Sequence, residues 1–459
     1  MQSNNRKNKN KNTSISFHSS ILTSQSFHPH TYVDLQPSGR SLLKLFATFF
    51  ILIFTICGFA FLLSSCSLSN QISKQATQLL LKGSVISTGH TGISIYEPAT
   101  GKYWYNYHAT KYFVPASNVK LFSLYAGMKY LGDSLVGLRY HQKEKGLIIY
   151  PTGDPTFLHP DFKQQPVFYF LSKSNTISYC TQHFTAALGY GWAWDDYMDA
   201  YMVQRSEFPV YGNLARVFTH GDTVSVIPKN IPIHIQNENE KNSVDNENIL
   251  SRKWDSNDLT LTASSALLTK KNYEMPLVTG LQELQNFLSD TLHKKINFID
   301  GKDSLSGEYK NFTKIYSQPA DSLFKPMMYN SDNFFAEQTL LMASNEHIGY
   351  MNDEAMIDTL LKTDLKDIPQ KPRWVDGSGL SRYNLFSPQS FVYLLNKMKN
   401  EFGMERLKVI LPTGGSGTFK NYYQKDSGFI YAKTGSLSNH IAISGFLLTK
   451  KAGGLSSLF

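Results

Sequence analysis

Alternating apolar and polar positions mark the first folded segment of the chain. The alternation runs over Gly92–Tyr96, turn-forming residues follow at Pro98–Lys102, and Tyr103–Tyr107 is a strand-like stretch rich in aromatic residues. Two such runs with turn residues between them predict a β-hairpin. Apolar residues then recur at helical spacing after Ser117 and stop at Gly132, which predicts a helix.

The pattern changes along the rest of the chain. Residues 145–310 carry short strand-like runs and one polar patch, Gln236–Asn248, whose composition predicts a solvated loop. Helical spacing returns from Asp321 and continues through Phe334–Met342.

The last part of the chain predicts strands. A glycine-rich turn at Pro412–Gly417 is followed by two strand-like segments, Gly428–Lys433 and His440–Thr449. The turn lacks the Gly-Lys-Ser/Thr ending of a phosphate-binding loop, so we do not expect a nucleotide there.

The N-terminus has a different pattern. Leu45–Leu63 is a 19-residue run without a charged residue, and basic residues precede it. Such a run is typical of a secretion signal or a membrane anchor. The residues that follow, Leu63–Cys66, resemble a bacterial lipobox, in which cleavage leaves Cys66 as a lipid-bearing N-terminus. We therefore expect residues 1–65 to be a lipoprotein signal peptide, with a single transmembrane anchor as the alternative.

The net charge of the chain without residues 1–65 limits the kinds of partner that it can bind. The 459 residues carry a net charge of +9, but residues 1–65 hold +5 of it, which leaves +4 on the other 394 residues. So small a charge provides no basic stripe and argues against nucleic-acid binding. Beside Cys57 and Cys66, only Cys180 remains, and we expect it to be a buried thiol. The 13 histidines show no ligand spacing, so we expect no metal and no cofactor.

A serine and a lysine stand at the start of the first predicted helix. Ser117 and Lys120 are three positions apart, so their side chains lie on one face of the helix. An unprotonated amine at Lys120 can accept the proton of the serine hydroxyl. The same Ser-x-x-Lys spacing also occurs at Ser41–Lys44 and Ser322–Lys325, so the motif taken alone favours a helix cap beside an exposed lysine.

Two further motifs follow in order. Ser331 and Asn333 belong to a Ser-Asp-Asn sequence at a predicted helix start and supply a hydroxyl for proton relay and an amide for a substrate carbonyl. Lys433-Thr434-Gly435 occurs at a predicted strand–turn boundary and offers a cation and a hydroxyl to a carboxylate, beside a glycine that permits close approach. The three motifs together are the signature of penicillin-binding proteins and β-lactamases.

The chain resembles the D-alanyl-D-alanine carboxypeptidase/endopeptidases of peptidase family S13, the penicillin-binding protein 4 (DacB) type. The resemblance extends from about Gly92 to Phe446 and rests on VPASNVKLF, GDPTF, GWAWDDYMDAY, YNSDNFFAEQTLL, VDGSGLSRYNLFSP, LPTGGSGTF and AKTGSLSNHIAISGF. It implies an α+β (α/β sandwich) fold of the penicillin-binding-protein/β-lactamase type, in which helices flank an antiparallel sheet and a mostly β domain is inserted. The 214 positions between Ser117 and Ser331 are far more than a class A β-lactamase needs and fit that insertion. We expect a catalytic domain at 66–145 plus 311–459 and an inserted domain at 146–310.

The resemblance also implies a role for each motif residue. Ser117 attacks the D-Ala-D-Ala carbonyl of a peptidoglycan peptide and becomes the acyl-enzyme serine, with Lys120 as its base; β-lactams acylate the same serine. Ser331 relays a proton to the leaving D-Ala, and Asn333 binds the peptide. Lys433, also counted among the catalytic residues, holds the terminal carboxylate together with Thr434, and Gly435 lies at the substrate backbone. The other substrate-binding groups that the resemblance implies are the N–H groups of Ser117 and Ser436 at the oxyanion, and Arg382 with Asp195 or Asp196 at a diaminopimelate side chain.

Some of these roles have simpler alternatives. Arg382 fits a structural ion pair, and both aspartates fit a solvated loop. Between the aspartates, Asp196 is favoured because Tyr201 follows it at the expected spacing. Trp192 and its neighbour Trp194 fit packing better than substrate contact.

The end of the chain bears on activity. Only 24 residues follow Gly435, where the family continues with another strand and a closing helix. We therefore expect an unpaired edge strand in the sheet.

Two functional hypotheses result. The first is a penicillin-sensitive serine D,D-peptidase, a D-Ala-D-Ala carboxypeptidase and/or cross-link endopeptidase, on the periplasmic side of the envelope and held to the outer membrane through the lipid on Cys66. The second is a catalytically silent protein of the same fold that binds peptidoglycan as a scaffold or is inactivated by truncation.

Overall fold

The computed structural model describes residues 69–84, 86–144, 146–182, 184, 186–220, 223–237, 249–263, 271–301, 312–449 and 455–458, together with Phe49. The described residues other than Phe49 all belong to one compact unit, Ser67–Phe459. Within this described part of the chain, no helix is both long and apolar enough to cross a membrane.

Three sequence predictions fall outside these residues. Cys66 is not described, and of the apolar run Leu45–Leu63 only Phe49 is. Most of the predicted solvated loop, residues 238–248, is not described either.

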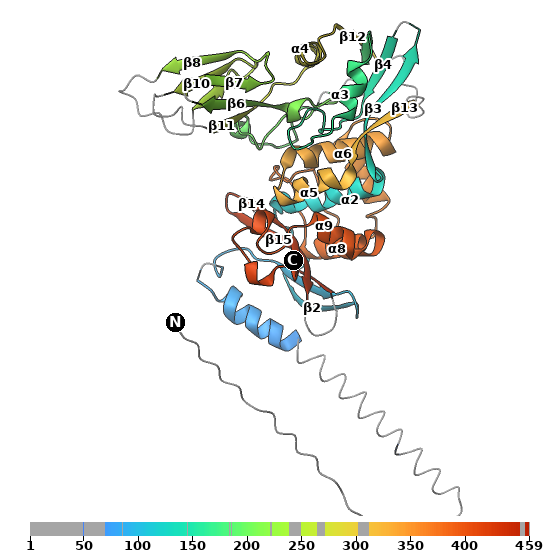
Figure 1. Ribbon diagram of the computed structural model, residues 1–459. Helices are drawn as coiled ribbons and strands as arrows, with labels where there is room; N and C mark the ends of the chain where they lie inside the picture. Colours follow the sequence, from blue (N-terminus) through green and yellow to red (C-terminus); the bar gives the residue numbers. More distant parts are fainter. Residues whose placement is uncertain are drawn as a thin grey trace, which may run out of the picture. The chain divides into compact units, whose positions relative to one another are not determined.

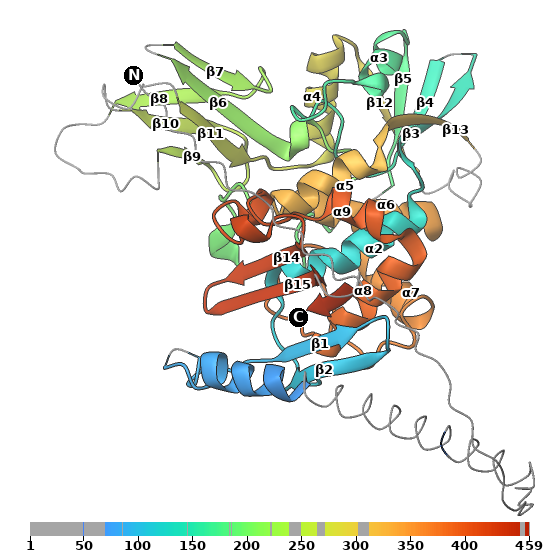
Figure 2. The same cartoon turned by 60° about the horizontal axis from the view of Figure 1, so that its bottom comes forward.

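One sheet is antiparallel throughout and carries the third motif. Its strands, in sheet order, are β14 (Ile430–Leu437), β15 (His440–Leu448), β16 (Leu455–Leu458), β1 (Ile93–Glu97) and β2 (Lys102–Tyr107). The predicted hairpin is confirmed, because β1 and β2 pair around a turn in which Gly101 has a φ of 70°. Figure 2 shows β1 and β2 below β14 and β15 in that view.

The expectation of an unpaired edge strand is wrong. β16 forms antiparallel ladders with β15 on one side and with β1 on the other, with Leu458 opposite both Gly445 and Ile95. The N-terminal hairpin and the β14–β15 hairpin therefore belong to one continuous sheet through the final described residues.

The strand that carries Lys433 is longer than the sequence pattern predicts. The predicted end was Lys433, but β14 continues to Leu437, which pairs with His440. The reversal falls later because Asn439 takes up the left-handed conformation that the turn needs, with a φ of 70°. As a result Lys433, Thr434 and Gly435 lie inside a strand and not at a strand–turn boundary.

The remaining strands form a mixed five-stranded sheet and two small ones. The five-stranded sheet has the order β12 (Ile296–Ile299), β5 (Ile177–Cys180), β4 (Gly146–Pro151), β3 (Ser134–Lys143) and β13 (Thr313–Pro319). The small sheets have the orders β11 (Lys271–Pro276), β6 (Leu214–His220), β7 (Thr223–Ile227) and β8 (Ile233–Asn237), β10 (Leu259–Ala263), β9 (Leu250–Arg252). Cys180 is buried on β5, as predicted.

Helices lie between the sheet that contains β14 and the mixed five-stranded sheet (Figure 1). Residues 69–76 are helical and continue into the π-helical turn Thr77–Leu81. The α-helices with described bounds are α2 (Lys120–Tyr130), α3 (Pro166–Ser172), α4 (Leu281–Leu292), α5 (Ala320–Tyr329), α6 (Asn333–His347), α7 (Asp353–Lys362), α8 (Pro388–Phe402) and α9 (Met404–Ile410). Helices and sheets together confirm the predicted α+β class. In Figure 1, α2, α5 and α6 lie between β14–β15 and the sheet that contains β3 and β13.

Among the described residues of the unit Ser67–Phe459, buried apolar side chains form two large hydrophobic clusters and a small third one around Tyr150 and Cys180. One of the large clusters is built around α2, α5, α6 and α8, and the other lies between the five-stranded sheet, α4 and the small sheets. Because β3 and β13 fall outside residues 146–310 yet belong to the five-stranded sheet, that sheet extends beyond both predicted limits of the inserted domain. The predicted domain limits stay a prediction.

The central helices are buried on all sides and approach one another closely. On α6, every residue from Phe334 to Asn345 is buried. A Cβ added to Gly127 of α2 would lie 2.6 Å from a ring carbon of Phe324 on α5 and 2.6 Å from the methyl of Thr339 on α6. This close packing fixes the starts of α2 and α6, which carry the first two motifs.

Candidate active site

Ser117 and Lys120 stand at the join between two helical turns. Ala116–Val119 is a 3₁₀ turn, and α2 begins at Lys120. Because residues i and i+3 eclipse in a 3₁₀ helix, the lysine side chain comes to lie over the serine. Lys120 Nζ donates to Ser117 Oγ at 2.8 Å. The turn is entered through Ala116, a residue with a left-handed φ of 49°, which is a strained conformation of the kind that clusters at functional sites.

Lys120 is completely buried and its ammonium group has three acceptors. Besides Ser117 Oγ, the Nζ donates to Asn333 Oδ1 at 2.6 Å and to the carbonyl oxygen of Ser378 at 2.8 Å. Burial lowers the pKa of Lys120 from 10.5 to about 8, although nearby carboxylates, first that of Asp332, act in the opposite direction. A lysine with this pKa is partly unprotonated near neutral pH and can act as a base.

The second motif is fixed by a helix cap. Asp332 is the N-cap of α6 and its Oδ1 accepts from the N–H of Phe335 at 2.8 Å. Asn333 is then the first residue of the helix, with its Oδ1 on Lys120 and its Nδ2 donating to the carbonyl of Tyr201 at 2.8 Å. Ser331, directly before the cap, is half-buried and has a left-handed φ of 58°.

The third motif lies against the first. The Lys433 side chain is buried, and its Nζ donates to the carbonyl of Thr434 at 2.6 Å. Burial, with the positive charge of Lys120 as a second cause, holds the pKa of Lys433 well below its usual value. A Cβ added to Gly435 would lie 2.5 Å from the carbonyl oxygen of Pro115 and 3.0 Å from the backbone nitrogen of Ser117. Strand β14 therefore passes directly beside the serine N–H, and only glycine fits there.

The substrate-binding residues predicted on β14 are accessible. Thr434 is half-buried and Ser436 is exposed, and they pair with Ile443 and Ile441 of β15. The structure thus brings Ser117, Lys120 and Asn333 into direct contact and places β14 beside them. The roles assigned to Ser331, Lys433, Thr434 and Ser436 stay predictions.

The residues predicted at a diaminopimelate side chain have separate neighbours. Asp196 accepts from the Tyr201 hydroxyl at 2.8 Å, and the Tyr201 carbonyl is the acceptor of Asn333, so Asp196 is linked to the second motif. Asp195 is exposed. Arg382 Nη1 donates to the carbonyl of Ser438 at 3.1 Å, next to β14, and no carboxylate among the described residues forms an ion pair with it.

The two tryptophans differ in their surroundings. Trp192 donates from its indole N–H to Asp376 Oδ2 at 3.0 Å. Trp194 is 75% exposed and stacks on Trp254 with ring centroids 5.7 Å apart. Packing within the protein therefore accounts for Trp192, whereas Trp194 is a surface residue.

Three buried charged residues behind Lys120 are not among those predicted from the sequence: Glu337, Asp376 and Arg205. Each is less than 3% exposed. The sequence does indicate that Glu337 is unusual. It interrupts an apolar helix four positions after Asn333, and a buried charge requires a partner. The partners themselves, more than 30 positions away, could not be identified from spacing.

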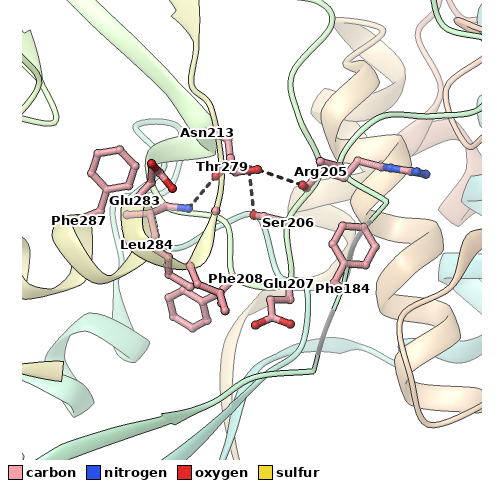
Figure 3. Close-up of a pocket in the computed structure, with 14 residues that line it drawn as sticks. Phe184, Arg205, Ser206, Glu207, Phe208, Asn213, Thr279, Glu283, Leu284 and Phe287 are labelled. Atoms are coloured by element: carbon pink, nitrogen blue, oxygen red, sulfur yellow. Dashed lines mark hydrogen bonds between the residues drawn. The ribbon is translucent and has the colours of Figure 1, made fainter. Parts of the chain in front are cut away.

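A separate cavity lies among residues of the second hydrophobic cluster (Figure 3). Its volume is about 220 Å³, and Phe208, Leu284 and Phe287 are among the side chains that line it. Polar groups of the wall bond to one another, as Asn213 Nδ2 does to Ser206 Oγ at 2.9 Å. None of the predicted site residues lines this cavity. Within the described residues, no group of three or more His, Cys, Asp or Glu side chains is placed to hold a metal ion.

A serine bonded to a buried lysine, with a Lys-Thr-Gly strand beside it on an antiparallel sheet, defines a serine acyl-transfer enzyme of the penicillin-binding-protein/β-lactamase class. The family model of the D-Ala-D-Ala carboxypeptidase 3 (S13) family matches residues 71–458. The chain belongs to this family, which confirms the predicted resemblance and the prediction of a serine-type D-Ala-D-Ala carboxypeptidase.

Solved structures support the fold. Penicillin binding protein 4 (dacB) from Haemophilus influenzae matches with a TM-score of 0.64 and 18% identity, over 84% of this chain and 91% of that chain. The same protein complexed with the novel β-lactam CMV matches with a TM-score of 0.59 and 18% identity over the same shares. The predicted transpeptidase fold is confirmed by these likenesses. A comparison with curated protein sequences gives no match.

Proposed function

We propose that this protein cleaves peptidoglycan stem peptides that end in D-Ala-D-Ala through an acyl-enzyme on Ser117, and that penicillins block it by acylating the same serine. The observation that carries the proposal is the 2.8 Å hydrogen bond between Ser117 Oγ and the buried amine of Lys120. Membership of the S13 family and the β-lactam bound to the H. influenzae protein of the same fold support it.

The acylation step follows from the positions of the side chains. Unprotonated Lys120 accepts the Ser117 proton while Oγ forms a bond to the carbonyl carbon of the penultimate D-Ala. The N–H groups of Ser117 and Ser436 hold the oxyanion, and one such donor typically contributes about 3 kcal/mol to the transition state. As the C–N bond breaks, Ser331 donates its hydroxyl proton to the departing amine and receives in return the proton that Lys120 took from Ser117, so free D-Ala leaves and Lys120 is again unprotonated. Water then attacks the ester and regenerates Ser117.

The substrate carboxylate is assigned to β14. Lys433 and the Thr434 hydroxyl lie along the strand that passes beside Ser117, so a peptide aligned with β14 would direct its terminal carboxylate toward them. Arg382, beside the same strand, and Asp196, linked to Asn333 through Tyr201, are assigned to the free end of a diaminopimelate side chain. Recognition of that group would extend the activity from carboxypeptidase to cleavage of peptide cross-links.

The site of action is proposed from the sequence of the N-terminus. The apolar run Leu45–Leu63 and the lipobox-like Leu63–Cys66 favour export to the periplasm and anchoring to the outer membrane by lipid on Cys66. Two or more acyl chains suffice for stable anchoring. A single transmembrane anchor remains the alternative.

Digestion of purified muropeptides tests the proposal. Mass spectrometry is expected to show loss of one D-Ala from pentapeptide monomers, and conversion of cross-linked dimers to monomers if cross-links are also cut. Ser117→Ala is expected to leave both substrates intact. Unchanged muropeptides with the wild-type protein would contradict the peptidase proposal and favour a silent peptidoglycan-binding protein.

A further inference from the structure

Glu337 joins two parts of the catalytic surroundings from inside the protein. It lies on α6, one helical turn after Asn333, and its side chain is completely inaccessible. One carboxylate oxygen accepts from the backbone N–H of Ser378 at 2.7 Å, and the other accepts from Arg205 Nη1 at 3.2 Å. The carbonyl of that same Ser378 accepts from Lys120 Nζ at 2.8 Å. Helix α6 therefore fixes the Lys120 amine at two points. Asn333 bonds to it directly, and Glu337 bonds to Ser378, whose carbonyl accepts from it.

The Ser378 segment is held on its other side by Asp376. Asp376 Oδ1 accepts from the N–H of Gly379 at 2.9 Å, and Oδ2 accepts from the N–H of Ser381 at 2.7 Å. Gly379 also touches the nucleophile turn, because a Cβ there would lie 2.0 Å from the carbonyl oxygen of Ala116. A segment bonded this tightly passes any displacement at Glu337 on to the Lys120 acceptor.

We infer that Glu337 is a positioning residue, which through Ser378 holds Lys120 against Ser117 and through its charge sets the pH range in which Lys120 acts as a base. The inference rests on the proposed peptidase function. It assigns Glu337 no contact with substrate.

The charges around Glu337 give the direction of its effect. Facing it are the carboxylates Asp376 and Asp353 and the cations Arg205 and Lys120. Burial, followed by repulsion from Asp376, raises the pKa of Glu337 to about 7. In return, the Glu337 charge is one of those that keep the pKa of Lys120 from falling further.

Loss of the Glu337 charge is expected to lower the pKa of Lys120. Replacing the carboxylate with an amide removes a negative charge near Lys120, which lowers its pKa, so the unprotonated amine is present at lower pH. The amide oxygen still accepts from Ser378, whereas Arg205 loses one of its two carboxylate partners.

Two variants, each of which removes one negative charge, distinguish a positioning role of Glu337 from a general effect on folding. Both Glu337→Gln and Asp353→Asn take a carboxylate from the buried Arg205 guanidinium, but Asp353 has no bond to Ser378. The rate of acylation by a labelled penicillin is measured for each full-length protein between pH 5.5 and 9.5, and thermal melting is recorded alongside. For Glu337→Gln we expect the acid limb of the pH–rate profile, where the rate rises as Lys120 loses its proton, to move to lower pH, and for Asp353→Asn we expect no movement.

A third variant tests the role of Glu337 if Glu337→Gln does not fold. Glu337→Asp keeps the charge but withdraws it from Ser378, so we expect the acid limb to stay in place while the maximal acylation rate falls about tenfold. Acid limbs that coincide in wild type, Glu337→Gln and Asp353→Asn would overturn the role of Glu337 while leaving the peptidase function intact. A wild-type protein that neither reacts with penicillin nor cleaves muropeptides would overturn both.

Discussion

Strand β14 passes so close to the nucleophile that a single methyl group at Gly435 should slow the reaction. The Cβ of Gly435→Ala would lie 2.5 Å from the Pro115 carbonyl oxygen, 3.0 Å from the Ser117 nitrogen and 3.1 Å from the Asn118 nitrogen. All three are backbone atoms, so no flexible side chain can move aside. Because a real Cβ atom essentially never lies closer than 3.0 Å to such a neighbouring atom, β14 and the serine turn must separate by about 0.5 Å.

The size of the effect follows from that displacement. A misplacement of 1 Å commonly costs about 100-fold in rate, so a shift of half that size predicts about a tenfold loss. Overpacking of this kind also destabilises a protein by about 1–3 kcal/mol. We expect both effects, a slower reaction at Ser117 and a lower melting temperature.

The assay is the second-order rate of acylation by a labelled penicillin, with thermal melting as a second readout. Gly89→Ala serves as the matched control, because a Cβ at Gly89 would meet only the Ile86 carbonyl oxygen at an ordinary 3.5 Å. An acylation rate for Gly435→Ala within a factor of two of wild type, with an unchanged melting temperature, would show that the close approach of β14 does not limit the reaction at Ser117.

Three further outcomes are expected. Acylation of the wild-type protein should rise with pH and level off above about 8, because the reactive form of Lys120 is the unprotonated one; a rate independent of pH between 6 and 9 would contradict this. Asp332→Ala should lower stability by about 1 kcal/mol, a fall of about 2–4 °C in melting temperature, through loss of the α6 cap, and an unchanged melting curve would argue against that cap. Asn333→Ala should lower acylation at least tenfold by removing one Lys120 acceptor and the link to Tyr201, and calorimetry would show whether the protein stays folded.

Local pattern was enough to predict the first hairpin and the helices that carry the first two motifs. The hairpin β1–β2, the helix after Ser117 and the helix through Phe334–Met342 are confirmed, because periodicity and turn residues are encoded within each segment. The contact between Ser117 and Lys120 was likewise predictable from a spacing of three residues.

Pairings between distant segments were not predictable in this way. β16 fills the sheet between β15 and β1, where the sequence suggested an unpaired edge, since sheet order depends on tertiary packing and not on the pattern of the strand itself. Similarly, Arg205 and Glu337 are 132 positions apart and meet only because α6 is buried. A buried charge can be suspected from sequence, but its partner requires the folded chain.

The most direct test of the account is the identity of the acylated residue. The wild-type protein is incubated with a penicillin, its intact mass is measured, and the modified peptide is sequenced by mass spectrometry. We expect one added penicillin mass per protein, located on Ser117 and absent from Ser117→Ala. No adduct on the wild-type protein, or an adduct that persists in Ser117→Ala, would contradict it.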